Sequence, residues 1–193
     1  MSIDSKLFKI AYKKLKSSVY YDKTQAILRN DLVKYEADIE NIEKYLEEFA
    51  ESFSDVKKRN TLIEEILSTI TYYAFPKKLT AEKGKMITNY VRKEIEVEEN
   101  QYFISMDIKG HILGVLWLML VGYRVDQKIY KHSYGNRIRS NLYNELSEEP
   151  TYSPYLFEPY FQQYESWRDK AMDEALHYLR SGQDVVVLTL DFK

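Results

Sequence analysis

Apolar residues recur every three or four positions along the first part of the chain, which is the spacing of one face of an α-helix. Residues 6–19 are predicted to form an amphipathic helix with one buried stripe, made of Phe8, Ala11, Tyr12, Leu15 and Val19. From Leu28 to Phe53 the apolar steps alternate between four and three, the spacing of the a and d positions of heptads, in the series Leu28, Leu32, Tyr35, Ile39, Ile42, Leu46, Phe49 and Phe53. This pattern predicts a single helix of about 30 residues.

So narrow a stripe, which we call the seam (the apolar series from Leu28 to Phe53), must pair with another helix. One partner is a helix predicted over 61–73, folded back as a hairpin, and the other is a second copy of the chain. We favour the hairpin because short connections place consecutive helices side by side.

Later segments also have helical periodicity. Pro76 is predicted to end the 61–73 helix, and Thr80 to cap a helix over 81–98. Residues 111–121 are apolar on every side, so this helix, Trp117 included, is expected at the centre of the core. After a connection over 150–159, a long helix is expected to turn Tyr160, Tyr164, Trp167, Ala171 and Leu176 inward and to stop at Ser181-Gly182. The alternative for Tyr160, Tyr164 and Trp167 is a strip of rings for stacking.

Residues 184–191 differ from everything before them, because they are β-branched and nearly all apolar. They predict a strand buried on both faces, which needs neighbouring strands that the earlier sequence does not supply. The sequence is therefore expected to be a fragment. The predicted fold is mainly α: a helical region over 1–74, a second helical region over 75–183, and the first strand of an α+β sheet over 184–193.

Composition narrows the classes of protein. Hydrophobic residues make up 45% and charged residues 30%, which is typical of a globular protein, and the net charge of −2 gives no overall preference for nucleic acid or membrane. Basic residues nevertheless gather over 77–93 and 124–139. The absence of cysteine excludes disulfides and thiolate metal sites. No signal peptide starts the chain and its longest apolar run, 112–121, is too short to span a bilayer, so a cytoplasmic protein without a membrane partner is expected.

A few residues suit phosphate or metal chemistry. Asp191 ends the predicted strand, which is a common place for a metal-binding carboxylate; alternatively it caps a turn. Arg137 and Arg139 are candidates for binding phosphate, because guanidinium groups offer paired donors, although each is as easily paired with a carboxylate. Lys77 and Lys78 are weaker candidates, since lysines are favourable beside a helix end in any case.

Four segments, in this order, resemble the fingers and first palm motif of bacterial defence-associated reverse transcriptases. They are Phe75-Pro76-Lys77-Lys78, the stretch 110–117, Ser133-Tyr134-Gly135-Asn136-Arg137-Ile138, and 186–193. The chain is similar to abortive-infection and other unclassified members more than to retron or group II intron enzymes. The resemblance covers roughly residues 75–193.

The resemblance implies roles for individual residues. Asp191 would bind the two Mg²⁺ ions of the intact enzyme, and the backbone at Phe192 and Lys193 would contact the incoming deoxynucleoside triphosphate. The intact enzyme would be an RNA-directed DNA polymerase in phage defence, with RNA or DNA template-primer as its partner. The paired-aspartate motif is not in this sequence, so the fragment is expected to be inactive and to bind no metal by itself. The alternative is a complete helical interaction module that self-associates through residues 28–53.

Overall fold

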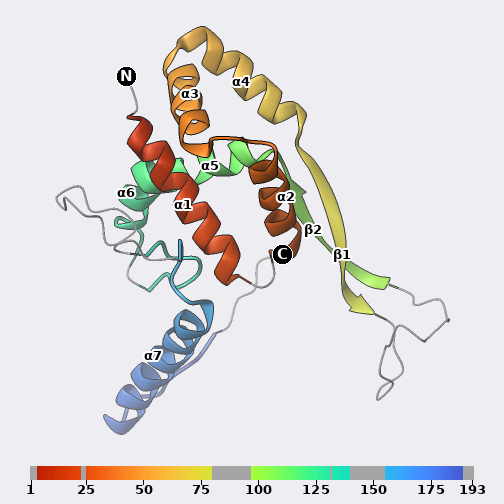
Figure 1. The fold of residues 1–193 in the computed structure, drawn as a ribbon. Helices are drawn as coiled ribbons and strands as arrows, with labels where there is room; N and C mark the ends of the chain where they lie inside the picture. The colour runs from red at the N-terminus through yellow and green to blue at the C-terminus, as the bar shows by residue number, and fades with distance from the viewer. Residues whose placement is uncertain (1–3, 23–24, 80–96, 131, 140–154, 189–193) are drawn as a thin grey trace. The chain divides into compact units, whose positions relative to one another are not determined.

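The computed structural model describes residues 4–22, 25–79, 97–130, 132–139 and 155–188. The chain is mainly α-helical with one small two-stranded antiparallel sheet (Figure 1), which confirms the predicted fold class. It divides into two compact units: residues 1–10 with 24–114, and residues 11–23 with 115–193. The three-part division expected from the sequence stays a prediction.

Helix α1, Ser5–Tyr21, contributes its first residues to the first unit and the remainder to the second. Its predicted stripe is confirmed, because Phe8, Ala11, Tyr12, Leu15 and Val19 are all buried. In the first unit, the Phe8 ring meets the rings of Phe49 and Phe53 edge to face, with centroids 5.0 and 5.8 Å apart.

The single helix predicted over 28–53 is wrong. The structure has α2, Ala26–Ala37, and α3, Ile42–Ser54, separated by a turn. Asn41 begins the second helix by accepting a hydrogen bond from the backbone N–H of Lys44 on its side-chain oxygen. The heptad spacing continues across this turn, and Leu32, Leu46 and Phe49 are buried on either side of it. The apolar spacing therefore records burial, and the capping residue decides where the helix breaks.

Helix α4, Val56–Ser68, follows α3 after one residue, Asp55, which caps it. The Asp55 carboxylate accepts hydrogen bonds from the backbone N–H groups of Lys57 and Lys58, both at 2.9 Å, and these bonds lower its pKa. Figure 1 shows α3 and α4 joined at this corner. Leu62 and Ile66 of α4 are buried, so the favoured hairpin partner of the seam is present, with earlier bounds than the predicted 61–73.

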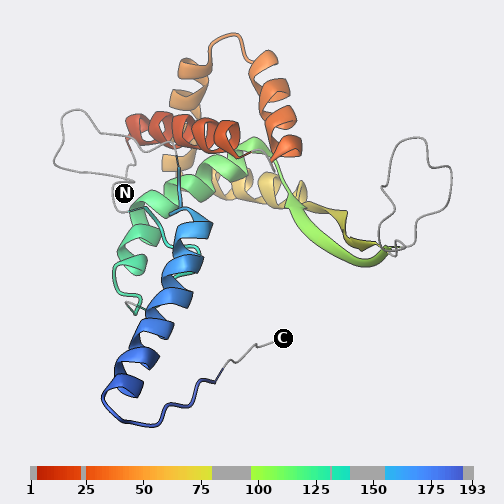
Figure 2. The same cartoon turned by 90° about the horizontal axis from the view of Figure 1, so that it is seen from below.

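The helix predicted over 61–73 was expected to run on to Tyr73 and to end before Pro76, and this is also wrong, because α4 ends at Ser68. Strand β1, Thr71–Leu79, pairs antiparallel with β2, Val97–Ser105, and Pro76 lies within β1. Proline is tolerated because each strand of a two-stranded sheet has one open edge, and the register shifts just after it. Figure 2 shows the two strands extending as a ribbon beyond the helices of the first unit. Of the predicted helix over 81–98, residues 81–96 lie outside the described residues, and residues 97–98 belong to β2.

The apolar segment around 111–121 is helical, as α5, Ile108–Trp117, a π-helical turn η1, Leu118–Gly122, and α6, Tyr123–Asp126. Ile112, Val115, Leu116 and Met119 are buried, but Trp117 is 55% exposed, so the prediction of burial on all sides is wrong. Among the described residues, this continuous helix over 108–126 is long and apolar enough to cross a membrane by length and composition alone, a test that core helices also pass.

The second unit ends in α7, Tyr160–Arg180, and Gly182 follows with φ +80°, the left-handed stop that the sequence predicts. The predicted inward face of α7 is exposed at Tyr164, Trp167, Ala171 and Leu176, contrary to expectation. Residues 183–188 then leave the helix as an extended chain (Figure 2) that pairs with no described strand. The buried strand predicted over 184–191 is therefore wrong for its described part, where Val186, Val187 and Leu188 are exposed. Residues 189–191 of the predicted strand lie outside the described part.

Candidate nucleic-acid site

The Ser133–Ile138 turn of the second unit is held by an ion pair between half-buried Arg137 and buried Asp126. Arg137 Nε donates to Asp126 Oδ1 at 3.0 Å, and Arg137 Nη2 donates to Asp126 Oδ2 at 3.1 Å. The same Nη2 reaches the Asp126 carbonyl oxygen at 3.1 Å, while Nη1 donates to the Ser133 carbonyl oxygen at 3.0 Å. The three guanidinium nitrogens therefore all donate within the chain.

Asp126 is the residue on which the turn closes. It is 5% exposed at the end of α6, and its Oδ1 also accepts from the backbone N–H of Ile138 at 3.2 Å. The hydrogen bonds to this carboxylate raise the pKa of Arg137. Asn136, just before Arg137, has φ +50°, a left-handed conformation that asparagine tolerates better than most residues. The structure thus places Arg137 in the carboxylate-paired arrangement that the sequence left open.

Arg139 has a looser environment. Its Nε lies 3.9 Å from Glu158 Oε2, and its guanidinium carbon lies 5.4 Å from the centre of the Tyr155 ring. The backbone beside it is fixed, because Arg139 N–H donates to the Leu156 carbonyl and Glu158 N–H donates to the Arg137 carbonyl. The Arg139 side chain is 31% exposed, against 22% for Arg137, so it is the more accessible of the two predicted arginines.

Lys77 and Lys78 lie on β1, far from any helix end in sequence, and each faces an acid on β2. Lys77 Nζ is 2.7 Å from Glu99 Oε1, and Lys78 pairs with Glu98. All four side chains have substantial exposure to water, where such pairs contribute about 0–1 kcal/mol. The other predicted site residues, Asp191, Phe192 and Lys193, lie outside the described residues.

A second group of residues near the turn forms a small pocket that the sequence did not predict as a unit. It has a volume of about 340 Å³, and we call it the aromatic pocket; it is lined by His132, Tyr134, Gly135, Gln163, Tyr164 and Trp167. His132 Nδ1 lies 3.4 Å from the Tyr134 hydroxyl, and the Tyr164 and Trp167 rings lie 5.6 Å apart at 40°. Lys170, one turn after Trp167, places its Nζ 5.2 Å from the centre of the Tyr134 ring.

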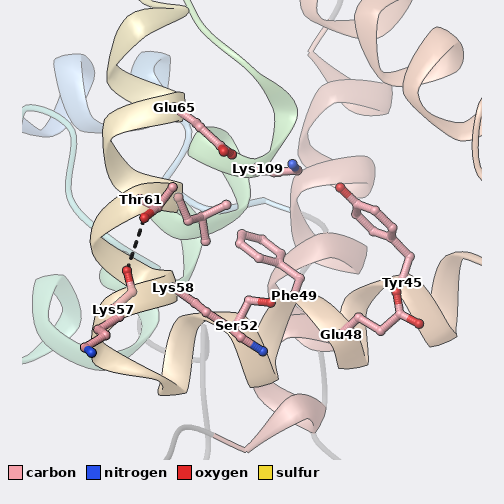
Figure 3. Close-up of a pocket in the computed structure, with 10 residues that line it drawn as sticks. Tyr45, Glu48, Phe49, Ser52, Lys57, Lys58, Thr61, Glu65 and Lys109 are labelled. Carbon is pink, nitrogen blue, oxygen red and sulfur yellow. Dashed lines mark hydrogen bonds between the residues drawn. The ribbon is translucent and has the colours of Figure 1, made fainter.

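The first unit has a larger pocket of about 500 Å³ between α3 and α4 (Figure 3). The pocket is lined by the apolar residues Phe49 and Leu62 and by charged residues of both signs, including Lys57, Lys58, Lys109, Glu48 and Glu65. The backbone donors at the start of α4 are already taken by Asp55. The mixture of charges gives this pocket no clear preference for an anion or a cation.

No group of three carboxylate, histidine or cysteine side chains within the described ranges is arranged to hold a metal ion. Asp126 was not predicted from the sequence as a functional or structural residue. An acid that follows a long apolar helix and precedes an arginine-bearing turn is nevertheless a signal that could have identified it. For Tyr164 and Trp167 the sequence predicted burial in the core, with a stacking strip that also includes Tyr160 as the alternative. Comparison with protein-family models, curated proteins and solved structures finds no match to this chain.

Proposed function

We propose that this chain is the N-terminal part of a bacterial defence-type RNA-directed DNA polymerase, which polymerises only together with the rest of its palm. The order of the four segments described above suggests the family. The observation that carries the proposal is the extended segment after α7, in which Val186, Val187 and Leu188 are 91%, 69% and 74% exposed. Three consecutive apolar side chains of this kind are normally buried on both faces of a central strand. Their exposure supports a strand that joins a sheet to which the described residues contribute no other strand.

Asp191 lies three positions after Leu188 in the sequence and is the proposed ligand of Mg²⁺. Two-metal polymerase chemistry requires carboxylates from separate strands, so one aspartate cannot assemble the site. By the same proposal, Phe192 and Lys193 lie beside the triphosphate of the incoming nucleotide. The template-primer would be RNA or DNA.

The test uses the protein expressed from its whole open reading frame, with labelled deoxynucleotides, Mg²⁺ and a primed RNA or DNA template. Asp191→Asn is expected to abolish synthesis, because the substitution removes a metal-binding charge. Asp184→Asn is the matched control in the same segment and is expected to retain it. Synthesis by the Asp191→Asn protein at the wild-type rate would remove Asp191 from the proposed site. Incorporation by residues 1–193 alone would contradict the requirement for the remaining palm.

A second candidate function is a helical interaction module without catalytic activity. The exposed apolar residues of α7, among them Met172, Leu176 and Leu179, favour it. The seam over 28–53 does not favour an interaction module, because it is divided between α2 and α3. Its most buried residues, Leu32, Leu46 and Phe49, are already covered within one chain. Sedimentation velocity across a range of concentrations tests this candidate: reversible dimerisation that Leu176→Glu abolishes, with no synthesis by the whole protein, would favour it over the polymerase.

A further inference from the structure

We propose that the aromatic pocket binds one nucleobase of a single-stranded nucleic acid by stacking, with Lys170 beside it to meet the adjoining phosphate. The inference rests on the proposed function only for the class of ligand. It adds a site of binding that the resemblance did not assign, on α7 and the turn before it. The members come from two stretches of the second unit, residues 132–135 and 163–167, so the pocket exists only in the folded chain.

The walls of the pocket are flat and accessible. Tyr164 and Trp167 are 47% and 49% exposed, so large parts of their rings remain in contact with water. Tyrosine and tryptophan bury area on binding while losing little side-chain entropy, and exposed rings of this kind are the usual stacking platforms for unpaired bases. His132 and Tyr134 supply aromatic surface from the turn.

The size and the polar groups of the pocket also suit a base. A volume of about 340 Å³ lies at the small end of ligand pockets, which span roughly 300–1,000 Å³. Gln163 is half-buried at the wall, and its amide offers both a donor and an acceptor to the edge of a base. Because an amide can present either group, the site is expected to discriminate weakly between bases.

Lys170 distinguishes a nucleotide from a neutral aromatic ligand or a proline-rich peptide. Its ammonium group lies near the Tyr134 ring at the pocket, where it can remain while contacting a phosphate of the same strand. A neutral ligand would gain nothing from this charge. The combination of stacking rings, an amide and one cation therefore favours a base with its phosphate.

The experiment is made on residues 1–193 and uses binding alone, so its result does not depend on synthesis. The chain contains two tryptophans, Trp117 and Trp167, and Trp117→Phe leaves Trp167 as the single reporter. Stacking of a base on Trp167 is expected to quench its fluorescence on addition of oligo-dT or oligo-U at low salt. An abasic oligonucleotide of equal charge should bind more weakly and should not quench. Comparison of the DNA and RNA strands shows whether either sugar is preferred.

Fluorescence anisotropy with labelled oligonucleotides measures the contribution of each side chain to binding affinity. Trp167→Ala is expected to weaken binding roughly 5- to 160-fold, since one stacked base contributes about 1–3 kcal/mol. Trp167→Phe should recover most of the loss. Phe161→Ala removes an exposed ring of the same helix that does not line the pocket, and it should leave affinity unchanged. Lys170→Gln should reduce the salt slope by about 0.7, the value of one single-strand phosphate contact.

Several results would overturn the proposal. They are the absence of binding at the lowest salt, binding without quenching of Trp167, and equal affinities for the wild type and a folded Trp167→Ala variant. Binding of a proline-rich peptide in place of oligonucleotides would overturn it as well. If the pocket binds no base but the whole protein synthesises DNA, the base-binding proposal fails and the polymerase proposal stands. If the pocket binds a base but the whole protein does not synthesise DNA, the polymerase proposal fails and the base-binding proposal stands.

Discussion

The Arg137 guanidinium donates two hydrogen bonds, 3.0 and 3.1 Å long, to the Asp126 carboxylate, and this carboxylate is almost completely buried. Removing one partner of a buried pair leaves the other charge without compensation. Arg137→Ala is therefore expected to lower the free energy of unfolding by about 3–5 kcal/mol, measured by urea denaturation. Arg139→Ala, at a longer and more exposed pair, should cost about 1 kcal/mol or less. Equal effects of the two substitutions would contradict the structural role of Arg137.

Arg139 allows an effect on nucleic-acid binding to be measured separately from an effect on stability. Arg139→Ala is expected to leave the fold intact while lowering the salt slope of single-strand binding by about 0.7, if its guanidinium contacts a phosphate. The measurement is anisotropy from low to moderate salt, with Arg168→Ala as an exposed control that is paired with its neighbour Asp169. An unchanged slope would take Arg139 out of the proposed template contacts.

Gly110 and Gly114 occupy the same face of α5 four residues apart, yet substitution should affect them in opposite directions. A Cβ at Gly110 would lie 2.9 Å from both Ile66 Cγ2 and Met106 Sδ, whereas one at Gly114 would meet nothing within 4 Å. Gly110→Ala is expected to destabilise the fold by about 1–3 kcal/mol through overpacking. Gly114→Ala should stabilise it by about 0.5–1 kcal/mol, because alanine restricts the unfolded chain and favours the helix. Thermal unfolding of the two variants tests the pair, and a destabilised Gly114→Ala protein would contradict this packing.

Lys14 is 2% exposed, and burial lowers its pKa from 10.5 to about 8. Between about pH 8 and pH 10.5 the unfolded chain binds more protons at this site than the folded chain, so its contribution to stability rises with pH through that window. Below about pH 8 the cost of the buried charge is fully present. Lys14→Met should remove this rise of stability with pH. Lys13→Met, at an exposed neighbouring position, should not remove it in denaturant titrations at several pH values.

Leu46, on the seam at 2% exposure, tests whether that seam is internal. Leu46→Ala is expected to cost about 2–5 kcal/mol and to leave the sedimentation coefficient of the native protein unchanged. Leu67→Ala, on the exposed side of α4, should cost little. A wild-type dimer that Leu46→Ala converts into stable monomers would show that the seam joins two chains.

The sequence predicted α1 well because all its burial lies on one stripe with regular spacing. It did not predict the break between α2 and α3, since the apolar phase continues through the turn and only Asn41 marks the new start. The β1–β2 ribbon escaped prediction for a different reason. Its side chains are exposed on both faces, so no alternation of apolar and polar residues exists to reveal it, and Pro76 resembles a helix stop.

The candidate site shows the same limit. The sequence identified Arg137 as a group suited to an oxyanion, but it did not show that Asp126, eleven positions earlier, supplies that oxyanion from within the chain. Aromatic residues of α7 were expected in the core because a helical stripe normally faces one. In the structure they are exposed beside the 132–135 turn. The periodicity of one helix cannot predict that two segments distant in sequence lie side by side.

The exposed ribbon has a consequence for hydrogen exchange. Nearly all of its described side chains are exposed, Tyr73 and Ser105 being the half-buried exceptions, so little apolar area is lost when the two strands separate. Its cross-strand amides should therefore exchange through local opening, far faster than amides beside Phe8 in α1, which require a larger unfolding event. A molecule that binds the ribbon would hinder this local opening. Its binding would therefore be detected as slower amide exchange confined to β1 and β2.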